Sequence, residues 1–123
     1  MKIYTSYYRK VSDDLRGMTP VSISTSTPYW FPWAIENLRM LVPGWDLVNG
    51  IKSGSITQEE YVERYKQKLS ELDKAEVLHK LQQISQDNHD KDIVLLCYEK
   101  PGDFCHRHLV AEWLDCDVTE LEA

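Results

Sequence analysis

A short stretch near the C-terminus concentrates side chains that could carry out chemistry. Residues 97–108 read CYEKPGDFCHRH and hold two thiols, Cys97 and Cys105, the second followed directly by His106 and Arg107. A thiolate is a nucleophile and a redox group, an imidazole moves protons near neutral pH, and a guanidinium binds carboxylates and phosphates through paired hydrogen bonds. This combination predicts a thiol site that binds an anionic ligand.

The elements around this stretch would hold its side chains at one edge of a sheet. Ile93–Cys97 is an unbroken apolar run, typical of a parallel strand buried on both faces. A helix capped by Asp103 is expected to follow and to end at about Asp115. The first thiol would then end a strand, and the second thiol, the histidine and the arginine would lie in the first turn of the helix. Ligands of open α/β sheets bind at such an edge, and a helix N-terminus attracts anions.

Each side chain of the stretch has a catalytic and a structural interpretation. We expect Cys105 to be the nucleophile or redox thiol, and His106 or Glu99 to move protons. Arg107 would bind the anion, with Cys97 beside the ligand. Alternatively, the cysteines and the histidine pack in the core, and Arg107 pairs with Glu99 to fix the loop. If both thiols lie together, a reversible disulfide requires Cα atoms within about 7 Å of each other.

Other ligand-binding signals are weaker. Tyr29 and Trp30 belong to an aromatic, proline-rich segment, residues 26–33, whose rings could stack on a base or could simply cover the sheet. Two cysteines and His106 are metal-ligand types, but no Cys-x2-Cys pair and no obvious fourth ligand accompany them, so we predict no metal site. Neither a G-x-G-x-x-G nor a P-loop motif occurs, and no cofactor is predicted.

The remaining sequence alternates strands with helices. We predict strands at Ile3–Tyr8 and Val21–Thr25, a connector over Arg9–Pro20, an irregular segment with at most a short helical piece over Ala34–Ser55, and two amphipathic helices from about Thr57 to Gln86. A capping box of Thr57 and Glu60 starts the first of these helices. Such alternation predicts one α/β domain over residues 1–123, a layered open sheet, mainly parallel, with flanking helices.

Composition narrows the partners and the compartment. The chain has 20 acidic and 14 basic residues and a net charge of -6, which argues against non-specific binding to nucleic acids or anionic membranes. The longest apolar run, Ile93–Tyr98, is too short to span a bilayer. Three cysteines without an export signal predict free thiols in a reducing, cytoplasmic compartment. A small anionic ligand is therefore the expected partner.

The run CYEKPGDFCHRHLVAEWL, residues 97–114, resembles the C-terminal signature of the domain-of-unknown-function family 488 (DUF488), in its short form. The signature positions correspond to Cys97, Glu99, Cys105, His106 and Arg107. The resemblance extends to the N-terminal strand, the aromatic loop and the segment GSITQEEYVERYKQKL. Longer members tend to have an Asp-x-Arg step after the second strand, where this chain reads SIST. The resemblance implies the fold and the site, and no particular reaction.

Three hypotheses of different classes follow. The first is a small enzyme that binds an anionic, nucleotide-like ligand and uses Cys105 as its reactive thiol. The second is a non-catalytic module that binds a ligand or a protein through the same pocket or through the aromatic loop. In the third, the signature residues only pack and hydrogen-bond the last helix. The reactivity of the thiols separates the first hypothesis from the other two.

Overall fold

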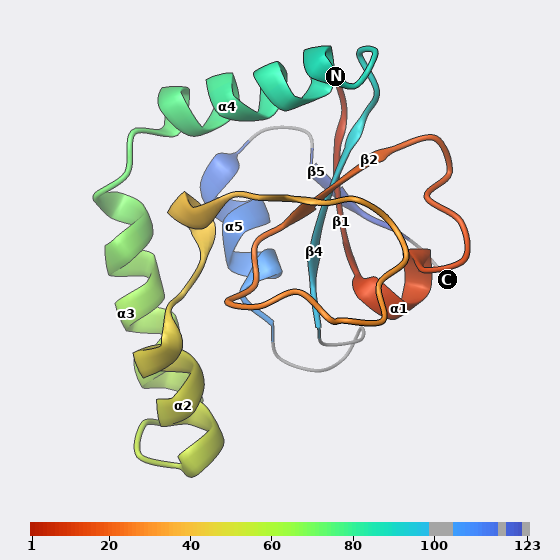
Figure 1. Cartoon of the computed structure of the whole chain (residues 1–123). Helices are drawn as coiled ribbons and strands as arrows, with labels where there is room; N and C mark the ends of the chain where they lie inside the picture. Colours follow the sequence, from red (N-terminus) through yellow and green to blue (C-terminus); the bar gives the residue numbers. More distant parts are fainter. Residues whose placement is uncertain (99–104, 116–117, 122–123) are drawn as a thin grey trace.

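A computed structural model describes residues 1–98, 105–115 and 118–121 (Figure 1). The elements follow one another as β1 (Ile3–Tyr7), α1 (Tyr8–Val11), β2 (Thr19–Ser22), β3 (Glu36–Asn37), the 3-10 helix η1 (Arg39–Leu41), α2 (Trp45–Ser53), α3 (Gln58–Ser70), α4 (Lys74–Asp87), β4 (Ile93–Cys97), α5 (Arg107–Leu114) and β5 (Val118–Glu120). No helix in this described part of the chain is both long and apolar enough to cross a membrane.

The strands form an open sheet in which every described pair is parallel. Their order is β3-β2-β4-β1-β5, so β4 lies between β2 and β1. Tyr7 pairs with Cys97, and Ser22 pairs with Leu96, which brings the carboxyl ends of these strands to one edge. From β2 the chain continues outward to β3, whereas from β4 it passes β1 to reach β5. The neighbours β2 and β4 therefore form a topological switch point, where α/β sheets open a crevice.

Both faces of the central strand are covered. Ile93 and Leu95 point into a large apolar cluster with side chains of α2, α3, α4 and α5. Val94 and Leu96 point to the other face, where Tyr8 of α1 joins a second cluster. Figure 1 shows α3 and α5 on one side of the sheet and α1 on the other. The unbroken apolar run of β4 follows from this burial on two faces, because neither set of its side chains meets solvent.

Several sequence predictions are confirmed. The layered, parallel α/β fold is present, and the predicted strand at Ile93–Cys97 coincides with β4. The two amphipathic helices appear as α3 and α4, separated by a short turn. The capping box also forms: the Thr57 hydroxyl accepts a hydrogen bond from the Glu60 amide at 3.1 Å, and the Glu60 carboxylate accepts one from the Thr57 amide at 3.1 Å.

Other predictions are wrong in extent. The predicted irregular segment Ala34–Ser55 contains β3 and the nine-residue helix α2, which starts after Gly44 and ends at Gly54 in the left-handed conformation. Strand β2 lies at Thr19–Ser22 and so starts two residues before the predicted strand. The short helix α1 takes up the last residue of the predicted first strand and the first three residues of the predicted connector. The strand β5 was not predicted. These elements are short, and the exposed β3 carries no apolar alternation that periodicity could detect.

The last helix begins later than expected. Its first residue is Arg107, so Cys105 and His106 precede the helix and do not lie in its first turn. Asp103, the expected cap, lies outside the described residues. The sequence pattern identified the apolar face of this helix but not its first residue, since helix ends are the least certain part of such predictions.

The capping box yields a stability prediction. Thr57→Ala should lower the free energy of unfolding by about 1 kcal/mol, because it leaves an amide in the first turn of α3 without its acceptor. Thr57→Ser keeps the hydroxyl and should lose much less. Urea denaturation of the three proteins measures the difference, and equal losses in both variants would contradict this role of the hydroxyl.

Candidate functional site

The two cysteines of the signature are bonded to each other. Cys97 ends β4, Cys105 lies just before α5, and their sulfurs form a disulfide with the Cα atoms 7.3 Å apart. The prediction of free thiols is therefore wrong for this pair. It was based on the cysteine count and on the absence of an export signal, and neither reveals that two thiols eight residues apart meet in space. Cys116 lies outside the described residues.

His106 connects this disulfide to the neighbouring strand. Its Nε2 lies 2.5 Å from the carbonyl oxygen of Ile23, directly after β2, and its Nδ1 lies 3.9 Å from Sγ of Cys105. Burial lowers the pKa of His106 to about 4; the hydrogen bond to Ile23 opposes this shift, and the positive charges of Arg107 and Lys68 add to it. The ring is then neutral at pH 7. Since a carbonyl can only accept, Nε2 carries the proton and the lone pair of Nδ1 faces the sulfur.

Arg107 is fully buried and serves a different contact from the one expected. Its guanidinium binds the carboxylate of Glu120 in β5, with Nε 3.1 Å from Oε1 and the terminal nitrogen Nη2 3.0 Å from Oε2. The other terminal nitrogen, Nη1, donates to Sγ of Cys97 at 3.2 Å. The ring of Tyr7 lies 5.9 Å from the guanidinium carbon. Glu99, the partner considered from the sequence, lies outside the described residues.

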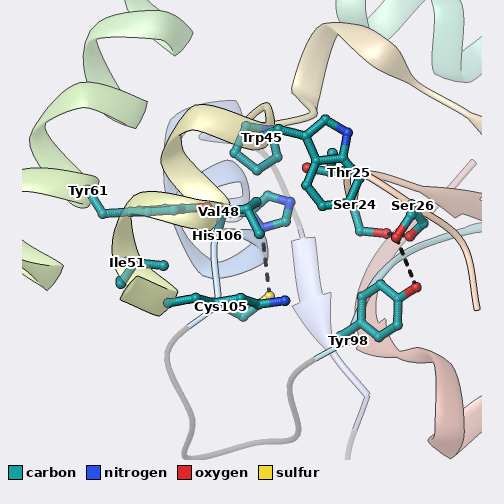
Figure 2. Close-up of a pocket in the computed structure, with 12 residues that line it drawn as sticks. Ser24, Thr25, Ser26, Trp45, Val48, Ile51, Tyr61, Tyr98, Cys105 and His106 are labelled. Carbon is teal, nitrogen blue, oxygen red and sulfur yellow. Dashed lines mark hydrogen bonds between the residues drawn. The ribbon is translucent and has the colours of Figure 1, made fainter. Parts of the chain in front are cut away.

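A cavity of about 610 Å³ opens beside Cys105 and His106 at the switch point between β2 and β4. Figure 2 shows these two side chains in the middle of the view, with Tyr61 and Ile51 to their left and Ser24, Ser26 and Tyr98 to their right. The described lining comprises Ser24, Thr25 and Ser26 after β2, Pro43, Trp45, Val48, Ile51 and Lys52 in and before α2, Tyr61 of α3, and Tyr98 after β4, together with Cys105 and His106. The lining thus combines an apolar wall with one cation and several hydroxyls.

Two separate groups of hydrogen-bonded hydroxyls lie in or beside the cavity. The Tyr8 hydroxyl lies 2.7 Å from that of Ser22 and 2.5 Å from that of Ser24. The Ser26 hydroxyl lies 3.2 Å from that of Tyr98 across the cavity edge, as Figure 2 shows. Thr25 differs, because its buried hydroxyl has no hydrogen-bond partner among the described residues.

The predicted aromatic ligands Tyr29 and Trp30 are not among the described residues that line this cavity. Tyr29 is 99% exposed. The guanidinium carbon of Arg9 lies 4.7 Å from the centroid of the Trp30 ring, so this ring packs against a cation. The rings that do line the cavity belong to Trp45, Tyr61 and Tyr98. The sequence analysis missed these residues and the hydroxyls of residues 24–26, although the position of these hydroxyls at the carboxyl end of the predicted strand Val21–Thr25 was a usable signal.

Fold and site together define a class: a parallel α/β protein with a cysteine pair, a buried histidine and a cavity at the carboxyl edge of its sheet. The chain belongs to the DUF488 family, because a family model described as the active DUF488-N3 subclade (DUF488-N3a) matches residues 11–117. The resemblance seen in residues 97–114 is thereby confirmed. No curated protein and no solved structure matches the chain.

The ion pair between Arg107 and Glu120 predicts that a substitution of Glu120, which does not line the cavity, lowers the stability of the fold. Glu120→Gln should lower the free energy of unfolding by about 2 kcal/mol, since it removes a carboxylate charge that pairs with a buried guanidinium, although Glu120 itself is 29% exposed. Glu112→Gln is the matched control, because the pair of Glu112 with Lys66 is exposed. Chemical denaturation measures the free energy of unfolding of both variants. Equal losses in the two variants would show that the buried pair stabilises the protein no more than the exposed pair does.

Burial of His106 predicts acid sensitivity of the disulfide form. Below pH 6.5 the unfolded chain binds a proton at His106 that the folded protein does not bind until about pH 4, so stability falls as the pH drops through this window. The gap between the two pKa values corresponds to about 3 kcal/mol.

Denaturation midpoints between pH 4 and pH 7 measure this loss against two variants. The His106→Gln protein should lack the histidine-dependent part of the loss, whereas His79→Gln, at an exposed position of α4, should retain it. Identical pH profiles for both variants would show that burial of His106 does not cause the acid sensitivity.

Proposed function

We propose that this protein is a thiol–disulfide redox enzyme whose substrate-facing thiol is Cys105. The observation that carries the proposal is the disulfide between Cys97 and Cys105 beside a cavity that Cys105 lines. In a two-thiol enzyme one sulfur meets the substrate and a second, protected sulfur completes the reaction. Cys97 is fully buried behind Cys105 and suits the second role.

The reaction is an exchange in which two electrons pass to a small disulfide. The Cys105 thiolate attacks one substrate sulfur, forms a mixed disulfide and expels the first thiolate. The Cys97 thiolate then attacks Sγ of Cys105, closes the intramolecular disulfide and expels the second thiolate. The two thiol protons leave with the two product thiols. A low-molecular-weight thiol or a dithiol protein then reduces the enzyme again.

The neighbours of the two sulfurs fit these steps. Nδ1 of the neutral His106 faces Sγ of Cys105 and can accept a hydrogen bond from its thiol, which orients the sulfur. The Arg107 guanidinium donates to Sγ of Cys97 and favours the thiolate there, which promotes the second attack. Arg107 is thus a positioning residue for Cys97. Glu99 remains a candidate for proton transfer.

We further propose that the substrate is small and anionic, and that the cavity accommodates a nucleotide-like ring of the substrate. Lys52 and the exposed hydroxyl of Ser26 supply polar contacts in the cavity, and Trp45 and Tyr98 supply aromatic surfaces. Lys52 takes over the role expected of Arg107, whose charge is already paired. We assign the activity to the cytoplasm, where a disulfide is usually transient and catalytic.

Trapping the mixed disulfide tests the proposal. The reduced protein, incubated with glutathione disulfide in the presence of a chelator, should reduce one equivalent of it. Cys97→Ser should stop at a glutathione adduct on Cys105, because the second thiol is missing. With Cys105→Ser, the reduction of glutathione disulfide should be no faster than in the absence of protein. Cys116→Ser is the matched control and should reduce glutathione disulfide as the wild type does. Intact-protein mass spectrometry follows each species.

The comparison of substrates tests the ligand class. Glutathione disulfide should react faster than the neutral hydroxyethyl disulfide if Lys52 attracts an anion. The redox proposal is overturned if Cys97→Ser forms no adduct, or if Cys116→Ser loses as much activity as Cys105→Ser. A reduced protein that binds glutathione disulfide without reacting would instead support a non-catalytic binding module.

A further inference from the structure

The cysteine pair and His106 form a cluster with the character of a metal site. Their ligand atoms, two sulfurs and an imidazole nitrogen, all lie within 4.8 Å of one another, and all three residues are buried. We propose that the reduced protein binds a zinc ion through both thiolates and Nδ1 of His106, with the fourth coordination position open to the cavity. This inference goes beyond the exchange reaction and does not depend on it.

The distances suit a tetrahedral ion after a small change. With Zn–S bonds of about 2.3 Å and Zn–N bonds of about 2.0 Å, a sulfur and a nitrogen on one zinc ion lie about 3.5 Å apart. Sγ of Cys105 and Nδ1 of His106 are 3.9 Å apart in the disulfide form. Reduction separates the two sulfurs, and the space between these three atoms can then admit the ion.

His106 is already oriented as a zinc ligand. Histidines that bind metals almost always donate their other ring N–H to a carboxylate or a backbone carbonyl, which fixes the tautomer. Nε2 of His106 makes this bond to the Ile23 carbonyl at 2.5 Å. The remaining nitrogen, Nδ1, therefore presents its lone pair to the sulfurs without any rearrangement of the ring.

Charge balance favours the ion in this buried place. Two thiolates neutralise Zn²⁺, and Arg107 is separately neutralised by Glu120 at 3.0 Å. The bond from Arg107 to Sγ of Cys97 can persist, because a metal-bound thiolate still accepts hydrogen bonds. Without the ion, two thiolates in the same place would leave uncompensated buried negative charge. Binding of zinc thus allows both thiols to lose their protons together.

The position of the ligands beside the cavity favours a zinc site of the open type. Structural zinc ions have four protein ligands, whereas catalytic ions have three and keep one position for water or substrate. The described part of the cluster supplies three ligands, and two of them, Cys105 and His106, line the cavity. Within residues 1–98, 105–115 and 118–121 no fourth ligand joins the cluster, as an open site requires.

Zinc and the disulfide exclude each other, because the same two sulfurs serve both. Hydrogen peroxide would take two electrons from the two thiolates, so that an S–S bond forms, the O–O bond breaks, two hydroxide ions result and zinc leaves. The cluster would then release its metal whenever the cysteine pair is oxidised. Metal occupancy would report the redox state of the site.

Metal analysis of both redox forms tests the proposal. The protein is reduced without oxygen, loaded with zinc and separated from excess metal by gel filtration; we expect one zinc ion per chain. The oxidised protein should retain none. Cys97→Ser, Cys105→Ser and His106→Gln should each weaken zinc binding at least about 100-fold in competition with a chromophoric chelator. Cys116→Ser and His108→Gln, at an exposed position two residues from His106, are the matched controls.

A second measurement needs no variant. Addition of hydrogen peroxide to the zinc-loaded wild type should release one zinc ion for each disulfide formed, as a zinc-binding dye and mass spectrometry would show. Cobalt(II) in place of zinc should give thiolate-to-cobalt charge-transfer absorption that changes when a small thiol is added, since the fourth position is open.

The proposal is overturned if the reduced wild type binds no more zinc than Cys97→Ser, if the controls lose zinc as the ligand variants do, or if peroxide forms the disulfide without releasing metal. Adduct formation by Cys97→Ser in the presence of a chelator is a separate result. It can succeed when zinc binding fails, and the reverse also holds, so the two proposals are tested apart.

Discussion

A buried guanidinium constrains how the last helix, α5, lies against the sheet. Arg107 has no exposed surface, and an unpaired charge in such a place would cost several kcal/mol. Its partners come from separate strands: Glu120 from β5, Cys97 from β4 and Tyr7 from β1. Satisfying this one side chain therefore fixes the start of α5 against the carboxyl edge of the sheet. This placement also holds Cys105, two residues before Arg107, near Cys97 at the end of β4.

The sequence predicted those parts of the fold whose signals are local. An apolar run is sufficient to identify Ile93–Cys97 as a buried strand, and the bonds between Thr57 and Glu60 join residues three apart. The exposed strand Glu36–Asn37 and the short strand Val118–Glu120 have no such signal, because only their pairing with distant strands makes them regular. The helix α2 was not recognised as a nine-residue helix, because glycines typical of turns, Gly44 and Gly54, stand directly before and after it.

The site could be predicted in composition but not in geometry. The clustering of Cys105, His106 and Arg107 in the sequence pointed to the right segment. The carbonyl of Ile23, which orients His106, lies 83 residues away, and Glu120, which neutralises Arg107, lies in a strand that the pattern did not reveal. Contacts of this kind depend on the completed sheet. The opposite wall of the cavity, from α2, was hidden for the same reason.

The strand order has a consequence for how the chain is made. In the described sheet both neighbours of β1, namely β4 and β5, come from residues 93–120, so β1 finds its hydrogen-bonding partners only after those residues have been synthesised (Figure 1). Until then its backbone groups are unpaired and accessible to other chains. Nascent-chain protection of Ile3–Tyr7, by a chaperone or by the ribosome surface, would matter more here than in a fold whose first strands pair with each other.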